Sequence, residues 1–415
     1  MKKTTLFIYI MMMSALHAQQ LNLDECINKA LSTHPDIKRF VLQVESSKRG
    51  GDVARADYLP QIKFNAEYNP TKTYTLPSGG VFNTVDSTAW QTGVTMNQKI
   101  WDFSKTTSNI KAQQIQENIS VLTLEDAKAL LAYKVRVQYE LMFVQKEAIK
   151  VRQKDLDAKE ELYKQAKALV KQGMKTNADA TRFLSSVYAA KNNLAISQSD
   201  FTKAKTILSL YINEHVDQDA VLQDTLSEAK WQNEDEQSVL QSSHALNSLK
   251  KNINKNELSY KVAKAAHYGS LDAVASYSHQ DNLNEYDSTM VGVTLNIPLY
   301  SGGRTTALVE QAIINKQSAE AEYNLRVLLF KEEFESLLID LKRYKQTIKA
   351  KELELQASEQ TKMILDARYK EGLSTYIEVL DASSLTLNAE LELLQTQLAR
   401  SSTIHRLEYL QGKII

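Results

Sequence analysis

Two parts of the chain alternate apolar and polar residues with a period of two. Segment 62–68 places isoleucine, phenylalanine, alanine and tyrosine on one face and lysine, asparagine and glutamate on the other, and segment 271–277 repeats the pattern less cleanly. Successive side chains of a strand point to opposite faces, so this alternation predicts β-strands. Each segment is followed by a further apolar-polar stretch, 90–100 and 291–299. The pattern therefore predicts two strand pairs.

Most of the remaining chain has the pattern of long helices. Segments 105–171 and 304–370 contain no glycine and no proline, the residues that most often interrupt a helix. At ~1.5 Å per residue, each segment could form a helix roughly 100 Å long. Apolar residues at three-to-four spacing in the first segment predict a coiled-coil seam. The predicted seam residues are Leu122, Leu130, Tyr133, Val137, Leu141 and Val144.

The strand pairs and long helices belong to an internal duplication. The strand motif that begins at Gly93 returns at Gly292, and the short motif around Gly173 returns around Gly372. Both landmarks recur after 199 positions. A constant offset between distant landmarks indicates that one unit has been duplicated.

The duplication predicts how the chain is organised. Two lysines, a short apolar run and Ala18 indicate an N-terminal secretory signal peptide. Each repeat contains a helix, a strand pair at about 60–101 or 270–300, and a long helical hairpin. The predicted segments are 1–18 (signal peptide), 19–213 (first repeat), 214–238 (linker region between the repeats), 239–411 (second repeat) and 412–415 (C-terminal tail).

Each long helix is predicted to end in a tight hairpin. Gly173 and Gly372 supply the left-handed conformation that closes a helix. A capping-box spacing follows each glycine and marks the start of the next helix. The two capping pairs are Thr176 with Asp179, and Thr375 with Glu378. Each repeat therefore turns back on itself at one glycine.

Composition argues against several classes of function. The 50 basic and 50 acidic residues are interspersed and leave no net charge, which disfavours binding to nucleic acid. No HExxH, GxSxG, phosphate-loop or CxxC motif is present, so we expect no enzyme activity, cofactor or metal site. The single cysteine, Cys26, cannot form an intrachain disulfide, and we expect it in a buried helix.

The strand pairs favour insertion into a membrane. Beyond the signal peptide no run of ~20 apolar residues occurs, so insertion would have to use strands. Aromatic residues near the strand ends are typical of interfacial belts. They are Tyr58, Tyr68, Trp90, Trp101, Tyr268, Tyr277 and Tyr300. The polar residues that would then face a water-filled lumen are Lys63, Asn65, Glu67, Thr95, Asn97, Thr294 and Asn296.

Membrane insertion would also require oligomerisation. Four strands cannot close a barrel around a lumen, and lipid does not tolerate an open sheet edge. Three copies would supply twelve strands, an even number within the range of such barrels. The segments between the paired strands, 69–86 and 279–289, are predicted to be extracellular loops. A soluble periplasmic coiled-coil adaptor or scaffold remains the alternative function, although it would not need amphipathic strand pairs.

The order of several short motifs resembles the TolC-like family of outer-membrane efflux proteins. These motifs are residues 21–31 with His34-Pro35, then Tyr58-Leu59-Pro60, then 297–304, and finally Tyr369-Lys370-Glu371-Gly372. The resemblance covers essentially the whole chain after the signal peptide, and segment 214–238 looks like the family's equatorial region outside the helical barrel. It implies a mixed α+β membrane protein, with four strands per chain and duplicated helical hairpins. It also implies a homotrimer with a 12-stranded β-barrel in the outer membrane and an α-helical barrel in the periplasm.

The resemblance further implies a passive exit duct of a tripartite efflux or type I secretion system. Its partners would be a periplasmic adaptor (membrane fusion) protein, an inner-membrane pump and outer-membrane lipid. The sequence does not specify which pump or adaptor it serves, or what it transports. Exposed hairpin tips would dock the adaptor. The implied docking residues are Gly173, Met174, Thr176, Gly372, Leu373 and Thr375.

A periplasmic gate is the last feature that the resemblance implies. Three copies of Glu378 and of Asp381 would form carboxylate rings at a constriction, with Tyr369 and Asp179 among the closing contacts. Glu378 has a second interpretation, in which it is only the capping partner of Thr375. The family's tip arginine is replaced by Ser374, so another contact must hold the closed state.

Overall fold

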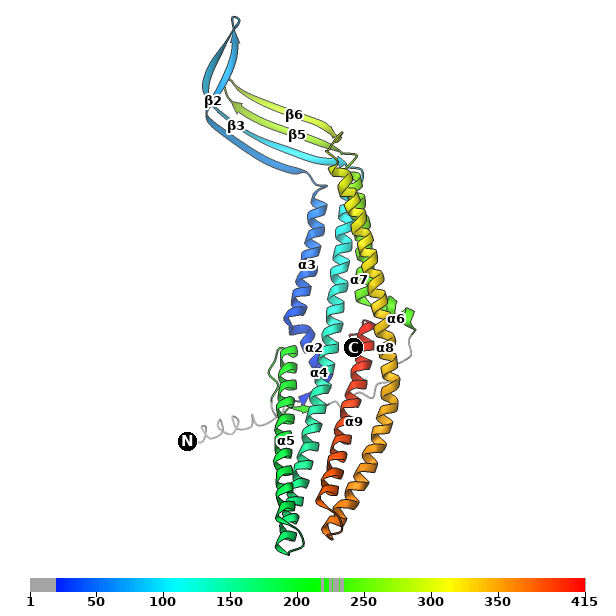
Figure 1. Ribbon diagram of the computed structural model, residues 1–415. Helices are drawn as coiled ribbons and strands as arrows, with labels where there is room; N and C mark the ends of the chain where they lie inside the picture. Colours follow the sequence, from blue (N-terminus) through cyan, green and yellow to red (C-terminus); the bar gives the residue numbers. More distant parts are fainter. Residues whose placement is uncertain (1–19, 218–219, 224–225, 227–230, 232–234, 415) are drawn as a thin grey trace, which may run out of the picture. The chain divides into compact units, whose positions relative to one another are not determined.

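The computed structural model (Figure 1) describes residues 20–217, 220–223, 226, 231 and 235–414. The predicted signal peptide lies outside the described residues, as do parts of segment 214–238 and residue 415.

The chain forms two compact units. The first, here called the hairpin unit, combines Met1–Arg39, Glu125–His244 and Leu328–Ile415. The second, here called the strand unit, combines Phe40–Leu124 and Ala245–Val327. Each unit therefore takes residues from both repeats.

The strand unit contains one four-stranded antiparallel sheet in the order β2-β3-β5-β6. The strands are β2 Gln61–Ser78, β3 Val81–Trp101, β5 Ser270–Asp281 and β6 Glu285–Asn296. Pairing of β3 with β5 joins the strand pairs of the two repeats into one sheet (Figure 1). In the described chain, β2 and β6 are the two edges of this sheet, so each has one side without a strand partner.

The sheet has one apolar face, as the alternation predicts. Ile62 is in register with Met96, and Met96 in turn aligns with Ala275 and Val291. Ile62 is 69% exposed and Val291 is 81% exposed. This apolar face is therefore left uncovered within the chain.

The opposite face of the sheet is polar. One row across it runs from Asn65 through Gly93 and Ser278 to Ser288. Lys63 and Thr95 lie opposite each other in the adjacent row. The predicted division into an apolar and a polar face is confirmed by this register.

The prediction of a long loop over residues 69–86 is wrong. These residues belong to β2 and β3, which continue as a two-stranded ribbon to a turn at Gly79 and Gly80, both with positive φ (Figure 1). Polar and proline-containing sequence suggested a loop, but β2 is an edge strand and such strands tolerate proline.

The second strand pair also differs from its prediction. Only residues 282–284 connect β5 to β6, so most of the predicted loop 279–289 is strand. Conversely, β6 ends at Asn296, and residues 297–299 lie outside it. Proline at position 298 lacks the N–H donor that a continuing strand pair would need.

The predicted long helices are confirmed. Helices α4 Lys105–Lys171 and α8 Arg304–Lys370 each contain 67 residues. Each is followed by a shorter antiparallel partner, α5 Asn177–Ile212 and α9 Tyr376–Leu410 (Figure 1). An apolar cluster of Leu156, Val187, Ala190 and Leu194 packs α5 against α4.

Shorter elements complete the described chain. They are β1 Gln20–Leu21, α2 Leu23–Thr33, α3 Pro35–Ala56, β4 Val221–Leu222, α6 Glu236–Ser242 and α7 His244–Ala265. Strand β1 pairs in parallel with β4, so part of the predicted linker is attached to the start of the first repeat. Cys26 is buried in α2, as predicted. Among the described helices, none is both long and apolar enough to cross a membrane.

The buried stripe of α4 differs from the predicted seam. Five of the predicted seam residues are only partly buried: Leu122, Leu130, Tyr133, Val137 and Leu141. The fully buried side chains in this stretch are instead Val135, Tyr139 and Met142. The same stretch buries the polar residues Arg136 and Glu140. The apolar positions alone predicted the wrong buried face of α4. The face that is buried also carries charged residues, and these are hydrogen-bonded.

A buried charged network joins α4 to α9 in the hairpin unit. Nε2 of His405 lies 3.0 Å from Glu140 Oε1, and Nδ1 lies 3.1 Å from Glu408 Oε2. Ser401 donates to the same Glu140 oxygen, and Arg136 donates to Glu408. Each ring nitrogen faces a carboxylate oxygen, so both can donate only if the ring is an imidazolium. Burial by itself lowers the pKa of His405, but its hydrogen bonds to the two carboxylates outweigh burial and raise that pKa to about 8.

We predict that His405 makes the stability of this unit depend on pH. The pKa of His405 is higher in the folded state than the ordinary 6.5, so its stabilisation is complete below 6.5 and is lost as the pH rises through 8. A shift of this size corresponds to about 2 kcal/mol. Thermal melting in detergent should show His405→Gln far below wild type at pH 6 and much closer at pH 9.

The matched control is His267→Gln, because His267 is exposed on the strand unit. Its melting temperature should differ from wild type by the same amount at all pH values. A His405→Gln deficit that is constant from pH 6 to 9 would contradict the protonated network.

Candidate functional site at the hairpin tips

The two hairpin tips have the same backbone geometry. Gly173 and Gly372 adopt φ values of 73° and 74°. The N–H of Met174 bonds the carbonyl of Leu169 at 3.0 Å, and the N–H of Leu373 bonds the carbonyl of Arg368 at 2.8 Å. These bonds satisfy carbonyl groups that a helix end leaves without partners. Each glycine is therefore required by the left-handed closure of its helix.

Both predicted capping boxes are confirmed. The Asp179 carboxylate accepts from the Thr176 backbone N–H at 3.0 Å, and the Glu378 carboxylate accepts from the Thr375 backbone N–H at 2.6 Å. In return each threonine hydroxyl accepts from the backbone N–H of its acidic partner. Hydrogen bonds from the backbone and side chain of Thr375 lower the pKa of Glu378. Glu378 is thus both a capping partner and a charged group.

An aromatic core packs the two tips against each other. Tyr369 and Phe183 are both 0% exposed, and their rings meet edge to face with centroids 5.5 Å apart. The buried cluster around them also contains Leu162, Ala166, Leu169 and Val379. It joins α4 and α5 of the first repeat to α8 and α9 of the second.

The structure places the four predicted gate residues in two groups. Tyr369 is in the aromatic core, and burial followed by the nearby Asp179 carboxylate raises its pKa. The hydroxyl of Tyr369 has no hydrogen-bond partner among the described residues, so it does not bond Asp179. Glu378 and Asp381 are instead exposed on the first turns of α9.

The predicted docking residues are all exposed. Met174 is 57% exposed and Leu373 is 68% exposed, each beside the glycine that closes its helix. Each tip therefore presents a flexible apolar side chain on a fixed backbone turn.

Lys175 is a tip residue that the sequence prediction missed. Its Nζ atom donates to the carbonyl oxygen of Ser374 at 3.3 Å and lies 5.4 Å from the centroid of the Tyr369 ring. Lys175 and Ser374 occupy the same position of the two repeats, 199 residues apart. Comparing the repeats position by position would have drawn attention to this lysine.

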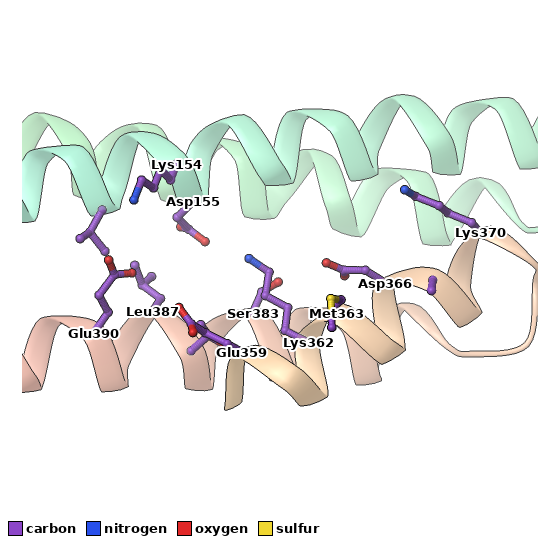
Figure 2. A pocket seen from close by; sticks show the side chains of 13 residues that line it. Lys154, Asp155, Glu359, Lys362, Met363, Asp366, Lys370, Ser383, Leu387 and Glu390 are labelled. Carbon is purple, nitrogen blue, oxygen red and sulfur yellow. The ribbon is translucent and has the colours of Figure 1, made fainter. Parts of the chain in front are cut away.

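A mixed-charge groove of about 640 Å³ lies between α4, α8 and α9 near the end of α8 (Figure 2). Lys154, Lys362, Asp366 and Glu390 line it. Burial raises the pKa of Asp366 and of Glu390. Among the described residues, no group of three or more potential ligands is placed to hold a metal ion. None of the predicted gate or docking residues lines this groove. The sequence pattern did not predict the groove, because lysine and glutamate on a helix are typical of an ordinary solvated face.

The chain combines a sheet that has one uncovered apolar face with long paired helices that have exposed tips, and comparison with known proteins assigns it to a family. The family model for "Outer membrane efflux protein" matches residues 26–214 and 236–413. The chain belongs to this family.

Individual proteins agree with the family match. The chain is 24% identical to the outer membrane protein TolC of Vibrio cholerae serotype O1, over 87% of this chain and 84% of that protein. The solved outer-membrane channel OprN superposes with a TM-score of 0.85 at 16% identity, covering 94% of this chain and 89% of that one. A structure of CusC gives 0.84 at 17% identity, covering 94% and 92%.

These comparisons confirm the predicted family, the mixed α+β fold and the outer-membrane location. The chain is an outer-membrane efflux protein, and its relatives are described as efflux proteins and channels rather than as enzymes.

We predict that the second capping box stabilises the start of α9. Thr375→Ala removes the hydroxyl that accepts from the Glu378 N–H, which should cost about 1 kcal/mol of local helix stability. Amide hydrogen exchange at residues 376–379 should accelerate roughly fivefold. Thr176→Ala should have the same effect at the start of α5.

Thr361→Ala serves as the control, because Thr361 lies within α8 and its hydroxyl bonds the carbonyl of Ala357. It should leave exchange at both tips unchanged. Unaltered exchange of the Glu378 amide in Thr375→Ala would show that the cap does not hold this turn.

Proposed function

We propose that this protein is the trimeric exit duct of an efflux or secretion system. The observation that carries the proposal is the sheet, which has an uncovered apolar face and two open edges, β2 and β6. Exposed edge groups need hydrogen-bond partners in lipid, and a closed barrel supplies them. Pairing β2 of one copy with β6 of the next would close twelve strands in a trimer.

The helical hairpins would continue this duct into the periplasm. Transport through the duct is passive, and an inner-membrane pump supplies the energy. A periplasmic adaptor would connect the pump to the tips, where Met174 and Leu373 offer exposed apolar contacts. Support for efflux comes from the family and from the relative described as the efflux protein BepC of Brucella suis biovar 1.

The periplasmic end would be gated by the hairpin tips. Three copies of Glu378 and Asp381 would place two carboxylate rings around the axis, which attract cations and repel one another as the opening narrows. Glu378 keeps its charge while capping α9, so the two roles of this residue are compatible. Opening would move the hairpins apart.

Native mass spectrometry of protein extracted from isolated outer membranes tests the architecture. We expect a trimer, because only oligomerisation satisfies the open edges of the sheet. A soluble periplasmic monomer would overturn the proposal and favour the alternative, a coiled-coil adaptor or scaffold.

We predict that the carboxylates of α9 make the channel selective for cations. The double variant Glu378→Gln with Asp381→Asn removes both charges, while glutamine can still cap the helix. In a bilayer recording across a KCl gradient, the reversal potential should move towards zero.

Glu352→Gln is the matched control, since Glu352 is an exposed carboxylate of α8 far from its end. It should leave the reversal potential at the wild-type value. An unchanged potential in the double variant would remove the ring assignment but would leave the duct intact.

A further inference from the structure

The strand pair of the first repeat is longer than that of the second. Strand β2 begins 32 residues before Gly93, whereas β5 begins 22 residues before the equivalent Gly292. The additional residues carry β2 and β3 past the turn between β5 and β6 (Figure 1). Residues 69–89, here called the extended ribbon, pair only with each other within the described chain.

The side of the sheet that is polar within the four strands becomes apolar in the extended ribbon. Val85 and Gly93 lie eight residues apart in β3, an even number, so they are on the same side. Val85 is in register with Tyr74, and Leu76 lies two residues further along β2. Leu76 is 40% exposed and Val81, on the same side, is 63% exposed. Tyr74, Leu76, Val81 and Val85 form what is here called the apolar strip.

The opposite side of the extended ribbon is mainly polar. Away from the turn it carries Thr73, Thr75, Thr84 and Asp86. The Thr73 hydroxyl donates to the Asp86 carboxylate at 2.7 Å. Only beside the turn does it carry apolar residues, Pro77 and Phe82. Within the four strands this same side is the apolar face, so both sides of the sheet change polarity where β5 and β6 end.

The change of polarity indicates what each side of the ribbon contacts. In the proposed barrel, the apolar face of the four strands meets lipid and the polar face meets the lumen. Past the end of β5 and β6, the side that continues the lipid face is polar, as a surface in water should be. The side that continues the lumen face is apolar and uncovered within the described chain. Removing such a strip from water is favourable, so it is suited to a contact.

The charges of the extended ribbon favour other copies of this chain as that contact. In a trimer, the lumen sides of three copies face one axis, so three identical strips face one another. Identical charges would repel at such an axis. The charged residues of the ribbon are Lys72, at its base, and Asp86, on the opposite side. The apolar strip itself is uncharged and can meet its own copies.

We propose that the apolar strips of three extended ribbons pack together and cap the outer mouth of the duct. The inference rests on the proposed function as a trimeric duct, and it adds a barrier at the end opposite the hairpin tips. Each ribbon is joined to the sheet only at its base and has no other strand beside it in the described chain, so it can swing aside. Cargo leaves when the ribbons part.

Crosslinking through Leu76→Cys tests the contact. Cys26 is buried, so the introduced thiol is the accessible one. In isolated outer membranes treated with copper phenanthroline and oxygen, Leu76→Cys should form disulfide-linked dimers roughly tenfold faster than Thr75→Cys, because neighbouring thiols have a high effective concentration. Thr75→Cys is the matched control, since Thr75 is exposed on the opposite side of the ribbon.

Conductance tests whether the contact closes the outer mouth. Leu76→Asp brings three carboxylates together at the axis, and their repulsion should part the ribbons and raise the single-channel conductance in bilayers. Thr75→Asp places the same charge on the opposite side and should conduct as wild type. Oxidised Leu76→Cys should conduct less than the same protein after reduction.

The outcomes separate the cap from the duct. Equally slow crosslinking of Leu76→Cys and Thr75→Cys, in a protein that native mass spectrometry shows to be trimeric, would overturn the cap and leave the duct. Dimers whose yield falls on dilution in detergent would come from contacts between separate channels and would also overturn the cap. Fast crosslinking with unchanged conductance in Leu76→Asp would overturn the barrier and leave the contact. A wild type that forms no trimer would overturn the duct, and the cap with it.

Discussion

A four-stranded sheet leaves the backbone N–H and C=O groups of its two edge strands without partners, and lipid offers them none. The sheet with the open edges β2 and β6 also has an uncovered apolar face. In a membrane, a single chain cannot supply hydrogen-bond partners for both of its own edge strands. The proposed oligomerisation and the proposed closed barrel both follow from this constraint.

The duplication gives the hairpin tips of both repeats the same local backbone structure. Both tips close at a glycine of φ near 73°, and both start the next helix with a capping box. The differences between repeats occur where the two halves meet. Lys175 faces Tyr369 and Ser374, so the first repeat complements the second at the tips. The duplication therefore accounts for the matching backbone of the two tips. Sequence differences between the repeats account for the contact between them.

Prediction succeeded where structure depends on neighbouring residues and failed where it depends on distant ones. Helices α4 and α8 and both capping boxes follow from glycine, proline and threonine positions within a few residues. The ribbon formed by residues 69–86 was mistaken for a loop, because its polar strands are stabilised by pairing with each other rather than by an apolar core. The α4 seam was misplaced because Arg136 and Glu140 are buried by bonding to α9.

The sequence by itself determined the period of each segment, the ends of its helices, the duplication and the family. Those features rest on local backbone preferences and on repeated motifs, which a single chain displays directly. Only the tertiary structure decided which helix faces meet. The contacts of His405 with Glu140 and of Lys175 with Ser374 join residues 265 and 199 positions apart. No local preference encodes such pairs, because packing selects them after the helices have formed.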